Sequence, residues 1–283
     1  MGRPLSKDAL VHRYKLALIP LALAAFSATT ASAQSFDWSG PYVGLNAGGL
    51  TDGRIRFDET TGELPNNTNA LDQGLRPVET DLDTSGFIGG AQIGYNRQFE
   101  GSGASFVLGV EADIAYVDSD ETETLSNTTM IGPLGTPSTV PVTRINEYSG
   151  GLDYLGTVRA RAGVAFDRLL VYGTGGMAYG RVKREVIFYG PNAPTEPYFA
   201  GSEADVQTGW TAGAGVEYAL GSDSMFNVFN SQAVTLRAEY LHYDLGDTEL
   251  DYPGVNGGAT IGGYTSRVST KGDLVRAGLN FKF

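Results

Sequence analysis

The sequence has no cysteine in 283 residues and only two histidines. A chain without cysteine has no disulfide framework, and its composition excludes thiol catalysis and thiolate metal sites. Basic residues are also scarce, with 20 against 32 acidic residues and a formal net charge of −12. An excess of negative charge argues against nucleic-acid binding. The folded chain must therefore be held together by its own packing, and we expect no nucleic acid among its partners.

Long apolar runs are scarce as well, and the longest, Leu16 to Phe26, has only eleven residues and contains a proline. A membrane-spanning helix needs roughly 20 apolar residues. The basic residues around the start of the run are Arg3, Lys7, Arg13 and Lys15. Because Ala31-Ser32-Ala33 follows as a small-residue cleavage site, residues 1–33 are predicted to be a secretory signal peptide, cleaved before Gln34. The mature domain would span residues 34–283, with 16 basic and 31 acidic residues, a net charge of −15 and His242 as its one histidine.

The mature chain is rich in glycine and aromatic residues, and eight of its segments alternate at period two, as strands do. The eight predicted strands are Pro41 to Thr51, Phe87 to Phe99, Ser105 to Tyr116, Tyr154 to Phe166, Leu169 to Val182, Trp210 to Leu220, Ala233 to Tyr243 and Leu274 to Phe283. The fifth of these is too rich in glycine for its phase to be assigned, because such strands slip register easily.

One face of these strands is apolar and the other carries charges interleaved with glycine and amides. The charged residues of the polar face are Glu111, Asp113, Arg159, Arg161, Glu217, Arg237, Glu239, Arg276 and Lys282. Arginines and carboxylates of similar number would fill a narrow barrel lumen and cancel each other's charge, so we predict that these nine residues form a structural ion network there.

Aromatic residues stand near both ends of the apolar face, in the pairs Phe87 with Phe99, Phe106 with Tyr116, Tyr154 with Phe166, and Trp210 with Tyr218. In three of the pairs the separation is ten to twelve residues, and ten residues of tilted strand climb about 25 Å, the height of the apolar band of an outer-membrane barrel. The closer pair, Trp210 and Tyr218, fits this spacing less well.

The segments between the predicted strands alternate in length. Residues 53–85, 119–149, 183–203 and 247–266 are long, whereas residues 100–104, 167–168 and 221–231 are short. A soluble ligand-binding barrel has no reason to place all its long connections at one end, but an outer-membrane barrel does. We therefore predict an all-β fold, an eight-stranded antiparallel up-and-down transmembrane β-barrel of the OmpA-like kind, with long extracellular loops and short periplasmic turns, located in the outer membrane.

Three segments together resemble a known family: Phe36 to Gly49 (FDWSGPYVGLNAGG), Val171 to Gly180 (VYGTGGMAYG) and the terminal AGLNFKF. The chain resembles the small outer-membrane β-barrel surface antigens of alphaproteobacteria, an OmpA-like porin family that includes heme-binding proteins. The resemblance implies that the last strand, with Leu279, Phe281 and Phe283, is the signal read by the barrel-assembly machinery. It also implies a structural or surface-antigen role, with a small porin or a heme-binding receptor as the alternatives.

The residues give little support for an enzyme or a bound cofactor. His242 lies on the outward phase of its strand, where an interfacial structural role is expected, although its pairing with a serine stays open at this stage. Glu111 and Asp113 stand two apart on one face, and Arg159 and Arg161 favour ion pairing over catalysis. The long connections are acidic, and Tyr189, Tyr198, Tyr252 and Tyr264 within them are exposed candidates for heme contact. The expected partners are outer-membrane lipid and lipopolysaccharide, the assembly machinery during insertion, and heme or host surface ligands at the loops.

Overall fold

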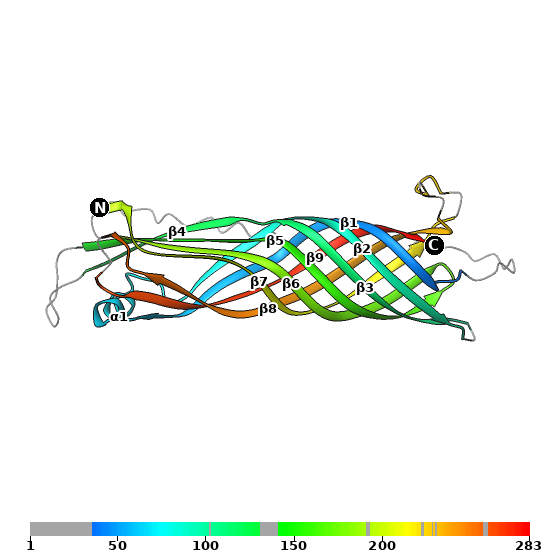
Figure 1. Ribbon diagram of the computed structural model, residues 1–283, viewed down its shortest axis with the longest axis horizontal. Helices are drawn as coiled ribbons and strands as arrows, with labels where there is room; N and C mark the ends of the chain where they lie inside the picture. The colour runs from blue at the N-terminus through cyan, green and yellow to red at the C-terminus, as the bar shows by residue number, and fades with distance from the viewer. Residues whose placement is uncertain are drawn as a thin grey trace, which may run out of the picture. The chain divides into compact units, whose positions relative to one another are not determined.

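The structure is a computed structural model of the chain, and it describes residues 36–101, 103–130, 141–190, 193–221, 224–227, 229, 231–256 and 260–283. The predicted signal peptide, residues 1–33, lies outside the described residues. Residues 35–283 form one compact unit, which is a β-barrel with a single short helix (Figure 1).

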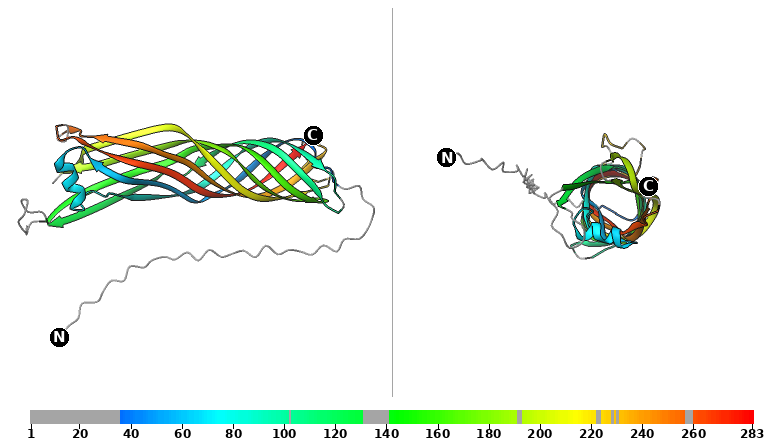
Figure 2. Two further views of the ribbon diagram at one scale, coloured as in Figure 1. Left: turned by 90° about the horizontal axis from the view of Figure 1, so that it is seen from below. Right: turned by 90° about the vertical axis from the view of Figure 1, so that its left-hand side faces the viewer.

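Antiparallel pairing closes the strands into a ring of eight positions. The elements are β1 (Gly40–Gly62), α1 (Pro65–Asp72), β2 (Thr80–Phe99), β3 (Ser105–Asp118), β4 (Glu121–Met130), β5 (Pro141–Phe166), β6 (Leu169–Gly190), β7 (Ala193–Ala219), β8 (Ala233–Pro253) and β9 (Gly263–Lys282). The strands β3 and β4 share one position, since they pair in succession with β5, and β1 pairs with both β2 and β9. The predicted eight-stranded antiparallel barrel is confirmed, and its end-on view is round (Figure 2).

The strands are about twice as long as predicted, reaching 26 residues in β5 and 27 in β7. Most of the residues expected in long loops therefore belong to strands that extend the barrel. The loop interpretation was wrong over these residues because β-bulges interrupt the period-two pattern, which shifts the inward phase by one residue. Register shifts lie after Leu50 in β1, between Leu152 and Tyr154 in β5, and between Asp244 and Asp247 in β8.

The bulges lie near the boundary between two halves of the barrel. We call the half that contains Phe283 the terminal half; it comprises residues 40–50, 86–99, 105–118, 154–180, 209–219, 233–244 and 273–283. The distal half comprises residues 53–85, 121–130, 141–152, 181–190, 193–208, 245–256 and 260–272. In Figure 1 the terminal half is on the right and α1 marks the far end of the distal half.

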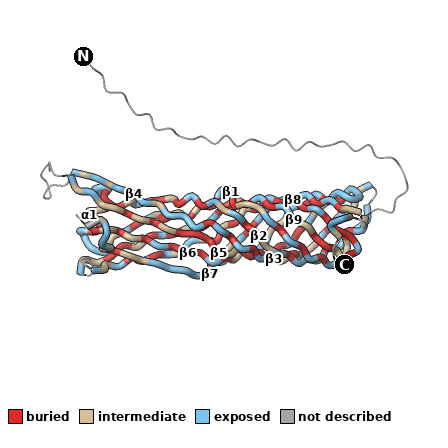
Figure 3. Tube along the Cα trace, turned by 90° about the horizontal axis from the view of Figure 1, so that it is seen from above, coloured by how far each residue is buried: buried red, intermediate tan, exposed pale blue. Residues whose placement is uncertain are grey.

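The terminal half is apolar outside and polar inside. Large outward side chains such as Leu45, Ile93, Val110 and Val158 are half or more exposed. The inward residues between them include buried polar side chains such as Asn46, Gln92 and Glu111, and buried and exposed residues alternate along the strands (Figure 3). Seven of the eight residues in the predicted aromatic pairs are exposed, with exposed fractions from 47% for Tyr218 to 62% for Phe106 and Tyr116, and Tyr154 is half-buried.

The distal half reverses this polarity. Its interior is an apolar cluster around Phe188, whose ring lies 5.9 Å from that of Tyr148 and 5.1 Å from that of Tyr252. Its outer wall carries ion pairs, among them Arg56 with Glu79 at 2.5 Å. An element with charges outside and hydrophobic residues inside is built for water. Water thus surrounds the distal half, whereas the terminal half suits an apolar solvent.

The wall of the distal half is not a continuous sheet. Pairing of β7 with β8 ends at Trp210 and Asp244, and pairing of β2 with β3 ends at Phe87 and Asp118. Beyond these points β2, β1, β9 and β8 form one sheet, and β4, β5, β6 and β7 form another. Two four-stranded sheets then face each other across the apolar cluster, as in a β-sandwich. A bridge between Phe199 and Gly254 rejoins β7 to the end of β8 at the far end.

Two outward residues near the terminal end are covered. Val234 and Phe281 lie in the outward phase of β8 and β9, but they are 0% and 5% exposed. The connection between β7 and β8 covers this position, where the ring of Phe229 meets that of Phe281 edge-on at 4.8 Å. Phe229 of this connection therefore packs against the outer wall.

Candidate functional site: a charged layer across the lumen

The interior of the terminal half is crossed by a layer of ion pairs, which we call the lumen network. Its members are Glu111 and Asp113 on β3, Arg159 and Arg161 on β5, Glu217 on β7, Arg237 and Glu239 on β8, and Arg276 on β9. All eight side chains are at most 3% exposed. The network thus unites four carboxylates with four arginines, and its formal charge is zero.

The network spans the whole width of the barrel. Arg237 donates two hydrogen bonds to Glu111, from Nη1 to Oε2 at 2.6 Å and from Nη2 to Oε1 at 2.8 Å. In the ring order, β8 and β3 are separated by four positions on either side, so they lie on opposite walls. Arg276 on β9 likewise reaches Asp113 on β3, with Nη1 to Oδ1 at 2.9 Å. These arginines tie one wall to the other through the middle of the lumen.

Arg159 lies at the centre of this layer. Its guanidinium donates to Glu111 at 2.5 Å, to Asp113 at 2.9 Å and to Glu239 at 3.1 Å, and its Nε donates to Thr157 at 2.8 Å. Three of the four carboxylates therefore depend on one side chain, whose own side-chain exposure is 0%.

Tyrosines fill the remaining space and add hydrogen bonds. The Tyr42 hydroxyl donates to Glu111 at 2.6 Å, and the Tyr172 hydroxyl donates to Glu239 at 3.0 Å. A Cβ on Gly94 would lie 2.3 Å from the Tyr42 ring. Only glycine leaves room for that ring on the neighbouring strand, which explains one inward glycine of the terminal half.

An amide chain extends the network toward the terminal end. Asn46 donates to Gln92 at 2.5 Å, Gln92 donates to Asn280 at 2.8 Å, and Asn280 donates to Glu217 at 2.9 Å. Sequence reasoning did not assign Asn46, Asn280 or Tyr42 to the site. Their inward phase was legible in the strand pattern, but we expected only charged residues in the network. Tyr172 was missed because the phase of its glycine-rich strand could not be assigned.

The structure separates Lys282 from the other eight predicted residues. Its ammonium is half-buried at the terminal rim and donates to the backbone carbonyl of Asp37 at 2.7 Å. No described carboxylate pairs with it. Its place in the network was a wrong expectation, because the inward phase of the last strand runs past the charged layer to the open end of the barrel.

His242 lies on the outer wall of the terminal half, near the boundary. Its Nδ1 is 2.7 Å from Asp273 Oδ1, and its ring lies 5.2 Å from that of Trp210. The Tyr240 hydroxyl donates to the same Asp273 oxygen at 2.7 Å. Within the described ranges, no serine hydroxyl bonds to this imidazole, and no group of three metal-ligating side chains occurs. The geometry fits an interfacial cluster.

The tyrosines considered as heme contacts are not exposed. Tyr252 and Tyr264 are 0% and 2% exposed and stack inside the distal half with ring centroids 5.8 Å apart. Tyr189 and Tyr198 are half-buried. These side chains mainly serve as core residues of the distal half, because the strands continue into the region that was expected to be loop.

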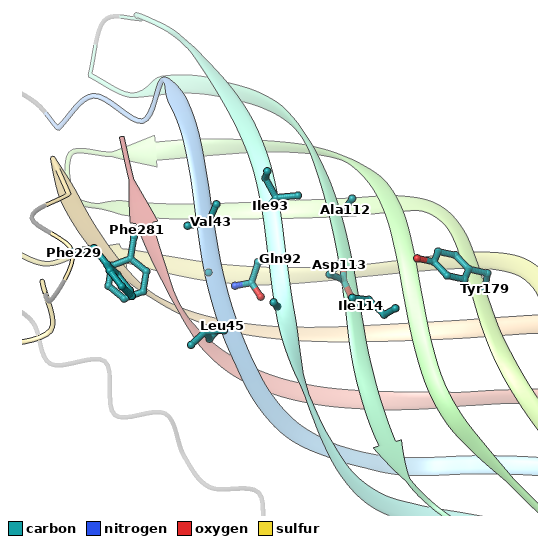
Figure 4. A pocket seen from close by; sticks show the side chains of 12 residues that line it. Val43, Leu45, Gln92, Ile93, Ala112, Asp113, Ile114, Tyr179, Phe229 and Phe281 are labelled. Carbon is teal, nitrogen blue, oxygen red and sulfur yellow. The ribbon is translucent and has the colours of Figure 1, made fainter.

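The outer wall of the terminal half has a shallow apolar groove, of about 530 Å³. Val43, Leu45, Ile93 and Ile114 line it from three adjacent strands (Figure 4). A groove of this kind on a wall that is apolar all round matches the packing of lipid chains against a barrel.

A closed barrel with an apolar outer band, aromatic residues at both of its edges and a charged, filled lumen is an integral membrane protein of the outer-membrane type. The chain belongs to the family described as the outer membrane protein beta-barrel domain, whose model matches residues 19–283. It is therefore an outer-membrane β-barrel protein. Among the described residues, no helix has the length and apolar character needed to cross a bilayer.

Two curated relatives agree with this assignment. The chain is 31% identical to a 31 kDa outer-membrane immunogenic protein of Brucella melitensis biotype 1, over 90% of this chain and 88% of the relative. It is 26% identical to a 22 kDa outer membrane protein of Rhizobium leguminosarum bv. viciae, over 72% of this chain and 70% of the relative. The outer membrane protein OprG from Pseudomonas aeruginosa aligns with a TM-score of 0.46 at 11% identity, covering 87% of this chain and 96% of that structure.

Proposed function

We propose that this protein is a structural, surface-exposed component of the outer membrane whose lumen does not conduct. The lumen network supports this most directly, since Arg237 and Arg276 connect opposite walls and no side chain of the layer is more than 3% exposed. An eight-stranded barrel has an interior just wide enough to be filled by side chains. Ions entering from either end would meet a neutral layer in which each charged side chain forms an ion pair.

A second barrier lies in series with the first. The apolar cluster of the distal half fills the barrel above the lumen network, with Phe57, Phe188 and Val268 all 0% exposed. A path for ions through the molecule would need both layers to open. This arrangement favours the structural role over the alternative of a small porin.

Planar-bilayer recording tests this proposal. The wild-type barrel should give no repeatable conductance steps, and neither should Phe188→Ala, which thins only the apolar cluster. The double variant Phe188→Ala with Arg237→Ala should leak, because both layers are then breached. Arg181→Ala with Phe188→Ala is the matched control, because Arg181 pairs with Asp153 at 3.6 Å on the outer wall. Repeatable wild-type steps that a bulky lumen substitution such as Asn46→Trp abolishes would refute the proposal.

The surface-antigen part of the proposal concerns the distal half. Its charged exterior suits exposure outside the cell, and the relative from Brucella melitensis is described as an outer-membrane immunogenic protein. Antibodies raised against the folded barrel should label intact cells, and treatment of the cells with an external protease should remove the labelling. Lipid and lipopolysaccharide would surround the terminal half. If antibodies label only permeabilised cells, the surface role is wrong.

A further inference from the structure

A cavity of about 230 Å³ lies at the far end of the distal half, and we call it the mouth cavity. Asn67 of α1, Arg76, Arg144 of β5, Tyr198 of β7 and Tyr264 of β9 line it. Four segments distant in sequence thus converge on one hollow. The proposed structural role of the barrel makes no use of it.

The mouth cavity holds two arginines without a counter-charge. Arg76 is 2% exposed, and its guanidinium donates to Ile145 O at 3.1 Å, Asn146 Oδ1 at 2.6 Å and Tyr189 O at 2.7 Å. All three acceptors are neutral. Arg144 donates to the carbonyl of Thr143 at 3.3 Å. Neither arginine forms an ion pair within the part of the chain that the structure describes.

This lack of pairing is unusual for the chain, because its other buried arginines meet carboxylates. Arg184, for example, is buried in the distal half and pairs with Glu203 at 3.1 Å. Burial lowers the pKa of Arg76 to about 10 and also lowers the pKa of Arg144. Both stay charged near neutral pH, so the mouth cavity carries two positive charges in a strongly acidic protein. An anion entering it would relieve an electrostatic cost that the fold leaves in place.

One residue that lines the cavity has an acceptor that lacks a donor. Asn67 is 2% exposed, and its Oδ1 atom is buried without a hydrogen-bond partner among the described residues. A buried polar atom without a partner is costly, and one that lines a cavity points to a ligand that supplies the donor. Asn66 is exposed and Arg144 is half-buried, so the cavity is accessible from the mouth of the barrel.

These features define the chemistry of a ligand. Guanidinium groups bind phosphate or carboxylate groups through paired N–H donors. Asn67 Oδ1 would accept a hydrogen bond from a hydroxyl group, and the rings of Tyr198 and Tyr264 form an amphipathic wall. We propose that the mouth cavity binds a small anionic sugar, with its phosphate or carboxylate between Arg76 and Arg144 and a hydroxyl donated to Asn67. This inference goes beyond the proposed structural role and does not depend on it.

Titration calorimetry on the folded, detergent-solubilised barrel tests the site, with glucose 6-phosphate as the probe. The sugar phosphate should bind more tightly than either inorganic phosphate or glucose, since only it satisfies both the arginines and Asn67. Arg144→Gln should weaken binding about tenfold or more, the effect of losing a charged hydrogen bond. Asn67→Ala should weaken glucose 6-phosphate binding but leave inorganic phosphate binding unchanged.

Arg267→Gln is the matched control, because Arg267 lies on the outer wall of the distal half and pairs with Glu59 at 2.7 Å. It removes the same charge and should leave binding unchanged. Heat-modifiable migration on a gel verifies that each variant is folded. If Arg144→Gln and Arg267→Gln weaken binding equally, the effect is one of net charge and the proposal is overturned. The proposal is also overturned if the wild-type barrel binds neither the sugar phosphate nor lipopolysaccharide.

The sugar could arrive free or as the phosphorylated sugar of a lipopolysaccharide. Vesicles with and without lipopolysaccharide separate these sources. If the wild-type barrel binds added glucose 6-phosphate in vesicles without lipopolysaccharide but not in vesicles with it, and Arg144→Gln binds it weakly in both, the occupant is the membrane's own sugar. Unchanged binding in both vesicles indicates the free compound. Binding of hemin with no sugar phosphate bound in either vesicle would overturn the assignment in favour of a porphyrin.

Discussion

At the scale of single residues, the lumen network depends on its equal numbers of arginines and carboxylates. Four arginines and four carboxylates exclude water from one another, so each charge relies on its partners for the stabilisation that water would otherwise give. Such a set adds little stability over a well-packed apolar core, but it makes each member hard to remove. The loss of stability on replacing an arginine should therefore differ between a buried arginine of the network and an exposed arginine of the outer wall.

Replacing Arg159 with methionine should destabilise the barrel by about 3–5 kcal/mol, because Glu111, Asp113 and Glu239 lose a shared donor while remaining buried. Arg181→Met on the outer wall should cost about 1 kcal/mol or less, since its partner Asp153 stays hydrated. Urea unfolding in lipid vesicles measures both. Equal unfolding midpoints for the two variants would contradict the central role given to Arg159.

Much of this site could be predicted from the alternation of single strands. Glu111 and Asp113 alternate with apolar residues along their strand, and this alternation assigns both side chains to the inward face. The same alternation assigns Arg159 and Arg161 to the inward face of their strand. The error at Lys282 arose because phase tells which way a side chain points and not how deep it lies in the barrel. The contribution of Tyr42 was missed although its inward phase was legible, because only charged residues were expected in the network.

At the scale of elements, the bulges decided how far prediction could go. In β1 the inward residues are even-numbered up to Leu50 and odd-numbered from Gly53 through Ile55 to Phe57. A period-two pattern broken by one residue looks like the end of a strand. In β2, where no register shift is recorded, the inward phase runs unbroken from Thr80 to Asn96. This part of β2 was not predicted as a strand because its outer face is acidic, whereas the predicted strands were identified by an apolar outer face.

The seam between β7 and β8 makes a prediction about local stability. From residue 202 to residue 208, β7 pairs only with β6, whereas from Trp210 to Ala219 it pairs on both sides. Every second amide in the unpaired stretch should therefore exchange its hydrogen quickly, while residues 211–218 of the same strand stay protected. Hydrogen exchange followed by mass spectrometry compares the two stretches directly. Equal protection would mean that the two sheets of the distal half are joined in solution.

For the last strand, we predict that assembly and stability depend on different residues. Phe283 is 47% exposed on the outer wall, whereas Phe281 is packed against Phe229. If the terminal aromatic is read during insertion, deleting Phe283 should sharply reduce the folded fraction in cells but barely change the unfolding of barrels already formed. Phe281→Ala is the contrasting variant, and it should lower the stability of formed barrels by about 3 kcal/mol. Normal assembly without Phe283 would remove its role as a signal.

At the scale of the whole molecule, the barrel reverses its polarity along its length. The same strands face lipid with apolar residues and enclose charges in the terminal half, then face water with charges and enclose apolar residues in the distal half. In the sequence alone, these two patterns indicate competing folds, a membrane barrel or a soluble one. Both patterns are present in succession, and the change between them occurs near the residues where the bulges lie.

The reversal fixes where the membrane must end, and the two tryptophans of the chain can report it. Trp210 is 51% exposed on the outer wall at the upper edge of the apolar band, and Trp38 is 2% exposed at the terminal end. In a Trp38→Phe variant, fluorescence would come from Trp210 alone. Lipids brominated near the headgroup should then quench strongly, and lipids brominated near the chain ends should quench weakly, because aromatic residues at the edge of the band lie at the interface. The complementary variant Trp210→Phe should resist both lipids, since Trp38 is covered by protein. Strong quenching of Trp210 by chain-end bromines would place the membrane over the distal half, where Asp83, Lys183 and Lys271 on the outer wall could not be solvated.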